Sequence, residues 1–152
     1  MKSKNINAPD LTLHPPRSPR VRLGGYAILA RCLDKGRATL AGKNGEYNFA
    51  CPLDQGLLEF AGIKANDLKR QLALGKSDSQ ILEWIGGNSK TKPQPWQIAQ
   101  WSAFAERRGA MDVETREYFT GLLAKISKMR EDINGWFDLL DLDDYVSFGG
   151  KA

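Results

Sequence analysis

Two groups of oppositely charged residues hold most of the side chains in this sequence that could bind a ligand. Residues 17–37, the basic cluster, carry five arginines and one lysine, and Asp34 is the single acidic residue among them. Residues 131–144 carry six acidic residues and no Lys or Arg. Guanidinium groups bind carboxylates and phosphates through paired hydrogen bonds. The basic cluster could therefore bind an anionic ligand or the acidic residues of the same chain, and we expect the two groups to be neighbours in the fold.

The first candidate site is an anion-binding site at the start of the basic cluster. Arg17, Arg20 and Arg22 come just before Gly24-Gly25, which we expect to open a helix. Unpaired N–H groups at a helix start favour phosphate or carboxylate, so these five residues together could hold a small anion. The spacing lacks the full G-x-G-x-x-G and G-x-x-x-x-G-K-[ST] patterns, and clearance for the backbone is the explanation we favour for the two glycines.

The second candidate site is built on aspartates near the end of the last predicted helix. Negative charge at a helix C-terminus is opposed by the macrodipole by ~0.3–1 kcal/mol per group, so these carboxylates need partners. Paired arginines, a Mg²⁺-type site and solvated surface charge are three explanations, and we favour arginines that join the two ends of the chain; no metal or cofactor is predicted. With a turn earlier in the chain, this candidate site or structural clasp comprises Asn44, Glu46, Tyr47, Asp138, Asp141, Asp143, Asp144 and Tyr145.

The thiols add one more candidate. Cys51 precedes Pro52 at the start of a predicted helix, where the macrodipole favours a thiolate, and it could therefore be a reactive thiol. Cys32 falls in an apolar stripe and should be a small buried residue. The single histidine, His14, lies in a proline-rich loop, so it cannot supply a catalytic triad or a zinc site without partners that the fold would have to gather.

Composition limits the class of protein. The chain has 152 residues, of which 41% are hydrophobic and 26% charged, as expected for one globular domain. The net charge of +4 hides a dipole, because residues 1–76 hold 13 Lys and Arg against 6 Asp and Glu, whereas the second half is acidic. No apolar run is long enough for a membrane span or a signal peptide. We therefore expect a cytoplasmic protein with reduced thiols and no membrane association.

Helical periodicity predicts a mainly α fold: a compact domain of about five to seven helices over residues 20–152, with at most one short β-hairpin near residues 39–49. Residues 1–19, with four prolines, form an irregular N-terminal arm. Glycines should end the first helix at Gly36 and another at Gly86-Gly87, after a capping box of Ser77 and Gln80. Residues 112–140 are predicted to form either one helix or two helices, because a break near 127–131 would divide them.

Several segments together resemble a family of bacterial domains of unknown function. They cover nearly the whole chain after the arm, and the C-terminal string is the most specific of them. The resemblance implies a single intact bacterial domain, and it adds no catalytic residue because the family has no assigned activity. The segments are PRSPR and LGG within 16–25, LDKGRA at 33–38, LAGKNGEY at 40–47, CPLD at 51–54, ILEWI at 81–85 and DLLDLDDYVSFGGK at 138–151.

No residue pattern assigns a reaction, so the function predicted from the sequence is a binding function. We expect a non-catalytic module that binds a small anionic metabolite or a protein partner. One alternative is a metal- or carboxylate-dependent enzyme that uses Asp138 or Asp141 as a ligand or general base. Another is nucleic-acid binding through the arginines of the arm, which is disfavoured because the sequence has no helix-turn-helix, zinc-finger or RNP-like pattern.

Overall fold

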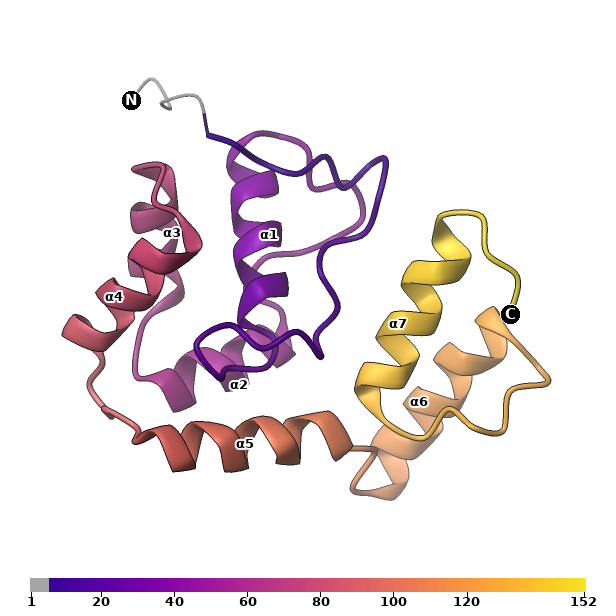
Figure 1. The fold of residues 1–152 in the computed structure, drawn as a ribbon. Helices are drawn as coiled ribbons and strands as arrows, with labels where there is room; N and C mark the ends of the chain where they lie inside the picture. The colour runs from indigo at the N-terminus through magenta and orange to yellow at the C-terminus, as the bar shows by residue number, and fades with distance from the viewer. Residues whose placement is uncertain (1–5) are drawn as a thin grey trace.

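The computed structural model describes residues 6–152, and over that range the chain forms seven α-helices and no strand beyond one isolated bridge (Figure 1). This confirms the predicted mainly α fold. No helix among the described residues is long and apolar enough to cross a bilayer. The helices are α1 (Leu29–Leu40), α2 (Pro52–Ala61), α3 (Ala65–Ala73), α4 (Asp78–Asn88), α5 (Pro95–Arg107), α6 (Val113–Ile126) and α7 (Trp136–Ser147).

Helix α1 is the centre of the main hydrophobic core. Leu29 and Leu33 recur at a spacing of four and are buried on one face, where α2, α3 and α4 contribute leucines and isoleucines. The charged residues Arg31, Asp34 and Lys35 of α1 are also buried. Every face of α1 is therefore covered, and its charged side chains have to find partners inside the protein.

Helix α7 joins this core to a second, smaller one. Phe137 is fully buried in the main core, whereas Leu139 and Leu142 pack with α6 residues around Phe119. The rings of Phe119 and Trp136 meet edge to face, with centroids 5.0 Å apart. In Figure 1, α5 runs along the base of the molecule and links the α1–α4 group to the α6–α7 pair. The body thus brings α7 beside segments from the beginning of the chain.

The first helix differs from its prediction at both ends. It begins at Leu29 rather than after Gly24-Gly25, because those glycines have φ of +58° and +83° and Ile28 has φ of 71°, which is incompatible with a right-handed helix. The helix also continues through Gly36 to Leu40. A Cβ on Gly36 would lie 2.5 Å from Leu72 Cδ1, so this glycine allows α1 and α3 to approach closely instead of ending the helix.

The optional hairpin is not formed, since residues 41–51 consist of turns. The Asn44-Gly45 pair does make a turn, in which Tyr47 N donates to Asn44 O at 2.9 Å. However, the chain beside it is the arm, because Leu11 N donates to Lys43 O at 2.8 Å. Beyond the turn, residues 39–43 and 47–49 therefore do not pair with each other as the two strands of a hairpin.

Two other boundaries show which local signals decided the structure. The capping box of Ser77 and Gln80 is present at the start of α4, but the predicted stop at Gly86-Gly87 is wrong because α4 continues to Asn88. Its end is set where Ser89 Oγ donates to Ala61 O of α2 at 2.6 Å. Residues 112–140 form two helices, separated by the irregular residues 127–135.

The predicted N-terminal arm is described only from residue 6, so its first five residues lie outside the described range. Residues 6–28 contain no helix. The side chains of Leu11, Pro16 and Pro19 are buried, so the arm packs into the body by its apolar residues. Its polar residues then lie against α1 and α7 in fixed positions.

We predict that removing the Ser102 hydroxyl destabilises the protein, because this buried group joins α5 to the segment before α1. Ser102 Oγ accepts from Ala27 N at 2.9 Å and donates to Gly25 O at 2.8 Å. Ser102→Ala would leave both backbone groups unsatisfied and should lower the free energy of unfolding by about 1–3 kcal/mol, measured by urea denaturation. Ser79→Ala, on the exposed side of α4, is the matched control; equal stability of the two variants would contradict the prediction.

Candidate functional site

The structure places the basic cluster against α7, and a buried ion pair is at the centre of this contact. Arg31 binds Asp144 through both terminal nitrogens, at 2.7 Å (Nη1–Oδ2) and 3.2 Å (Nη2–Oδ1). The Tyr47 hydroxyl donates to Asp144 Oδ1 at 2.7 Å, and its ring lies 5.4 Å from the Arg31 guanidinium carbon. Burial and this hydrogen bond to a carboxylate raise the pKa of Tyr47. The phenol therefore stays protonated and serves as a donor.

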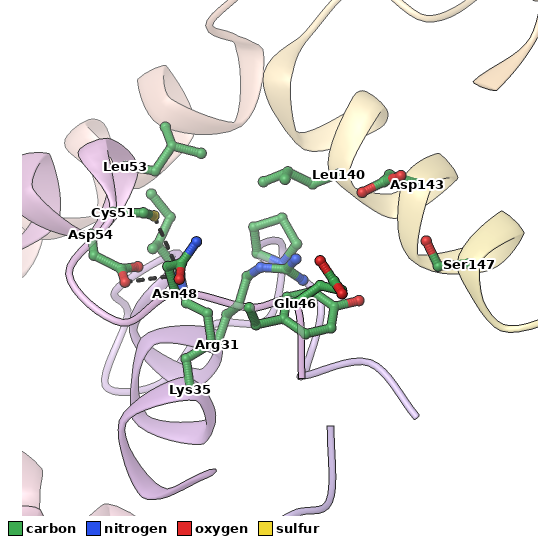
Figure 2. A pocket seen from close by; sticks show the side chains of 13 residues that line it. Arg31, Lys35, Glu46, Asn48, Cys51, Leu53, Asp54, Leu140, Asp143 and Ser147 are labelled. Carbon is green, nitrogen blue, oxygen red and sulfur yellow. Dashed lines mark hydrogen bonds and ion pairs between the residues drawn. The ribbon is translucent and has the colours of Figure 1, made fainter. Parts of the chain in front are cut away.

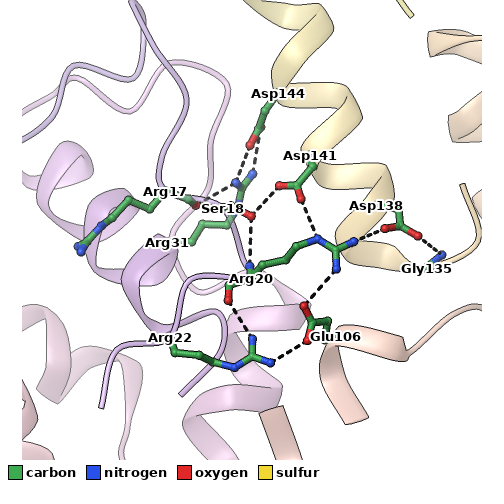
Figure 3. A network of polar contacts seen from close by, with 10 residues as sticks. All are labelled: Arg17, Ser18, Arg20, Arg22, Arg31, Glu106, Gly135, Asp138, Asp141 and Asp144. Carbon is green, nitrogen blue, oxygen red and sulfur yellow. Dashed lines mark hydrogen bonds and ion pairs between the residues drawn. The ribbon is translucent and has the colours of Figure 1, made fainter. Parts of the chain in front are cut away.

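A second network surrounds Arg20, which binds three carboxylates (Figure 3). Its guanidinium contacts Glu106 of α5 at 3.2 Å, Asp141 of α7 at 3.1 Å, and Asp138 of α7. Ser18 Oγ donates to Asp141 Oδ1 at 2.8 Å from the other side. Asp138 and Asp141, the two carboxylates of the enzyme alternative, are thus both paired with Arg20 in this structure.

The other arginines of the predicted anion site also have carboxylate partners. Arg17 binds Asp34 at 3.0 Å and Asp78 at 2.8 Å, and Arg22 binds Glu106 at 2.8 Å. All three arginines of the predicted anion site, Arg17, Arg20 and Arg22, are therefore engaged in ion pairs within the protein.

The glycines of the predicted anion site serve packing. A Cβ on Gly24 would lie 2.5 Å from Leu82 Cδ2, and one on Gly25 would lie 3.2 Å from Ile98 Cγ2. Because α1 begins four residues after Gly25, the expected cradle of N–H groups at a helix start is not at these glycines. Clearance for the backbone explains both positions.

The remaining predicted residues divide between a local role and a cavity. Asn44 holds its own turn, since Asn44 Nδ2 donates to Tyr47 O at 2.9 Å. Tyr145 is exposed and lies against Gly150. Glu46, Asp143 and Cys51 line a cavity that also includes Tyr47.

This cavity has a volume of about 220 Å³ and lies between α1, the segment 46–54 and α7 (Figure 2). Its apolar walls come from Pro19, Ile28, Leu53 and Leu140. Its polar groups come from elements far apart in the sequence, and these lining residues are Arg31, Lys35, Glu46, Tyr47, Asn48, Cys51, Asp54, Asp143 and Ser147.

A polar group of the buried Lys35 and Asp54 and the half-buried Cys51 forms the floor of the cavity, and sequence reasoning missed Lys35 and Asp54. Lys35 Nζ lies 2.8 Å from Asp54 Oδ2 and 3.3 Å from Cys51 Sγ, and Figure 2 shows both contacts. Burial lowers the pKa of Lys35, but the charges of Asp54 and Cys51 outweigh it, so the pKa of Lys35 is raised and the ammonium is retained.

Asp54 is the least satisfied member of the floor. Its Oδ2 also accepts from Ala50 N at 3.0 Å. Its Oδ1 is buried and accepts no hydrogen bond of ordinary geometry from residues 6–152, although the buried Cys32 thiol interacts with this carboxylate. A signal for this group was present in the sequence, because Lys35 follows Arg31 by one helical turn on the helix that also carries Leu29 and Leu33, and Asp54 is the acidic residue in the first turn of α2.

Two strained residues border the cavity. Ile28 has φ of 71° and Ala50 has φ of 61°, a left-handed conformation that costs non-glycine residues roughly 1–3 kcal/mol each. Ile28 lines the cavity directly, and Ala50 precedes Cys51 at the floor. Such strain persists only where the surrounding contacts hold it, and it is concentrated at ligand sites. Here it fixes the direction of the backbone on two sides of the cavity.

The rim of the cavity is acidic. Glu46, Asn48, Asp143 and Ser147 are exposed there, whereas Lys35 and Asp54 are buried below. Burial, followed by the neighbouring charge of Asp144, raises the pKa of Asp143. The two cations of the lining, Arg31 and Lys35, are already paired with carboxylates. The site therefore offers hydrogen-bond acceptors and unpaired negative charge rather than free positive charge.

Comparison with known proteins identifies a family but no activity. A family model described as "Domain of unknown function (DUF5069)" matches residues 13–146, which includes the arm from Leu13 and all of the cavity lining except Ser147. No curated protein matches the chain. Within residues 6–152, no three side chains of His, Cys, Asp or Glu are grouped so that they could hold a metal ion.

We predict that Asp144→Ala destabilises the protein by about 3–5 kcal/mol, because it leaves the buried Arg31 guanidinium unpaired. The double variant Arg31→Met with Asp144→Leu removes both charges and should lose less stability than the single variant. Urea denaturation at neutral pH measures both. A double variant as unstable as Asp144→Ala would show that the unpaired charge is not the cause.

We also predict an acid-dependent contribution from Asp78. Burial raises the pKa of this carboxyl, but hydrogen bonds from Arg17 and Arg37 outweigh burial and lower it. A lowered folded-state pKa stabilises the fold above the unfolded value of about 3.9, and this stabilisation is lost as the pH falls further.

The test is the pH dependence of Asp78→Asn. This variant should cost about 1–2 kcal/mol at pH 7, and the difference from wild type should shrink below about pH 4. Unfolding free energies between pH 7 and pH 2 measure this, with Asp67→Asn in the exposed pair with Arg70 as control. A difference that is constant over this range would contradict the assignment.

Proposed function

This chain belongs to the DUF5069 family of domains of unknown function, and we propose that it is a binding module for a small molecule that carries an ammonium or similar hydrogen-bond donor group. The ligand enters the cavity between α1, the segment 46–54 and α7. The observation that carries the proposal is the buried oxygen Asp54 Oδ1, which accepts no hydrogen bond from residues 6–152. The sequence favoured a small anion, but the arginines expected to bind it are paired with carboxylates.

At the floor of the cavity, Asp54 Oδ1 can accept a hydrogen bond from a ligand. A buried polar atom without a hydrogen bond costs roughly 1–3 kcal/mol, so natural proteins satisfy nearly all such atoms. Asp54 Oδ2 is already bonded to Lys35 and to a backbone N–H, and these contacts hold the carboxylate in place. An N–H or O–H group of a ligand would satisfy Oδ1 without disturbing this arrangement.

The rim selects for the same kind of group. Glu46 and Asp143 face the mouth of the cavity and form no ion pair with any of residues 6–152, so they attract a cation and repel an anion. Burial and the charge of Asp144 raise the pKa of Asp143 more than the charge of Arg31 lowers it, so this carboxylate has incomplete charge compensation. A ligand ammonium placed between the rim and the floor would supply it.

The walls and the volume limit the size of the ligand. Leu53, Leu140 and Ile28 present apolar surface, so the ligand has an apolar part beside its donor group. Pockets for drug-sized molecules have volumes of about 300–1,000 Å³, and this cavity is smaller. The group could belong to a free metabolite or to a lysine side chain of a protein partner, which was the other partner expected from the sequence. The free thiols of Cys32 and Cys51 support a reducing, cytoplasmic location.

We predict that n-butylammonium binds in the cavity and that butyrate, of the same chain length, does not. So small a ligand should have a Kd on the order of 1 mM or weaker. Titration of each into the protein, followed by amide chemical shifts in NMR spectra, should show changes centred on Asn48, Cys51 and Asp143 for the amine alone.

Leu140→Trp tests the location, because the larger side chain fills the cavity and should abolish the shifts. Leu74→Trp, at an exposed position after α3, is the matched control and should leave them unchanged. Preferential binding of butyrate, or amine-induced shifts that survive Leu140→Trp, would refute the proposed function.

A further inference from the structure

We propose that Cys51 is a nucleophile that accepts an acyl group from an ester or thioester bound in the cavity. This inference deepens the proposed function and rests on it, because the acyl donor has to enter the same cavity. The donor is of a defined class: a small ester or thioester whose acyl part carries an amino group, which the acidic rim would bind.

The position of the sulfur supports a nucleophilic role. Cys51 is half-buried and lines the cavity, so a ligand can reach its Sγ. The ammonium of Lys35 donates to Sγ at 3.3 Å. A cation in contact with sulfur stabilises the thiolate, and the thiolate is the reactive form. The raised pKa of Lys35 is consistent with this role, since the amine remains charged beside the sulfur.

Asp54 positions both groups. Its Oδ2 holds the Lys35 ammonium at 2.8 Å and the N–H of Ala50 at 3.0 Å, and Ala50 is the strained residue that directs Cys51 toward the cavity. Its Oδ1 is buried at the same floor. This oxygen is independent of the Cys51 thiol, and among residues 6–152 it accepts no hydrogen bond of ordinary geometry, although the buried Cys32 thiol interacts with the same carboxylate.

The start of α2 supplies the remaining requirement of acyl transfer. Cys51 is the N-cap of this ten-residue helix. The first N–H groups of a helix have no intrahelical acceptor, and Pro52 has no N–H, so Leu53 and Asp54 carry the first N–H groups of α2 that can donate. Donors of this kind stabilise the oxyanion that forms when a carbonyl is attacked.

The step is balanced with groups that the substrate and the protein provide. The electron pair of the Cys51 thiolate forms a bond to the carbonyl carbon, and the carbon–oxygen or carbon–sulfur bond to the leaving group breaks. The leaving group departs with that electron pair as an alkoxide, phenolate or thiolate and takes a proton from water. The product on the protein is a thioester of Cys51, and no oxidant or reductant is involved.

Cys32 provides an internal comparison. It is fully buried, and burial, followed by the charge of Asp54, raises its pKa well above the ordinary thiol value. It should not react with the same reagents. The Cys51 thiol thus lies on the cavity surface beside an ammonium, whereas the Cys32 thiol lies in the main hydrophobic core.

The test is acylation by p-nitrophenyl acetate at pH 7, followed by intact mass and peptide mapping. One acetyl group should appear, on Cys51, and Cys51→Ala should abolish it, whereas Cys32→Ala should react like wild type. The native thiol should react at least about tenfold faster than the same residue in the unfolded chain, because contact with an ammonium is absent there. Acetylation elsewhere, or a native rate no higher than the unfolded rate, would overturn the inference.

The role of Lys35 is tested with two variants. Lys35→Gln should slow acetylation by about tenfold, and Lys35→Arg, which keeps the charge, should restore much of the rate. Circular dichroism checks that both variants are folded. If Lys35→Gln does not fold, the comparison of native with unfolded wild-type protein still tests the inference. Equal rates in folded Lys35→Gln and wild type would contradict activation by the ammonium.

A last comparison separates this inference from the proposed function. Binding of n-butylammonium to the wild-type protein, followed by NMR, is measured separately from acylation, so failure of one is distinguishable from failure of the other. The ratio of the native to the unfolded acylation rate should be larger for the p-nitrophenyl ester of glycine than for p-nitrophenyl acetate, because the rim binds the amino group of the glycine ester. Equal ratios for the two esters would leave Cys51 a nucleophile and refute the charge selection of the cavity; binding without acylation would do the reverse.

Discussion

The burial of three charged side chains on α1 is the constraint on which the arrangement of the other segments depends. A buried ion without a partner costs several kcal/mol, so Arg31, Asp34 and Lys35 require opposite charges inside the protein. Each partner comes from a different part of the chain: Asp144 from α7, Arg17 from the arm, and Asp54 from α2. The pairs do not have to add much net stability to have this effect, because a misplaced segment would leave a charge unpaired. They specify where three segments dock.

The cavity follows from the same pairs. Lys35 and Arg31 lie one turn apart on α1, and their partners approach from opposite sides, so the space between α2 and α7 is bounded by fixed polar groups rather than by interdigitated apolar side chains. Strain at Ile28 and Ala50 is held by the contacts around it. A binding site of this kind is preorganised, and a ligand would meet groups that are already oriented.

Local signals in the sequence were reliable where one contact decides the outcome, and they failed where packing decides it. The capping box at Ser77 and the proline at Pro52 mark the starts of α4 and α2 correctly, because each acts within one helical turn. Gly36 was expected to end α1 but lies inside it, and only the position of Leu72 explains why. The charge pattern anticipated arginine–aspartate pairs in the chain. It could not anticipate Lys35 with Asp54, because that pair depends on how α2 docks against α1.

The Arg31–Asp144 pair has a consequence for synthesis of the protein on the ribosome. Its two residues are 113 positions apart, so α1 leaves the exit tunnel long before α7 has been translated. Until then the Arg31 guanidinium has no carboxylate, and enclosing it in the core would be unfavourable. The nascent chain should therefore keep α1 hydrated and loosely packed while translation continues, which makes folding of this body a late event that depends on contacts of high sequence separation.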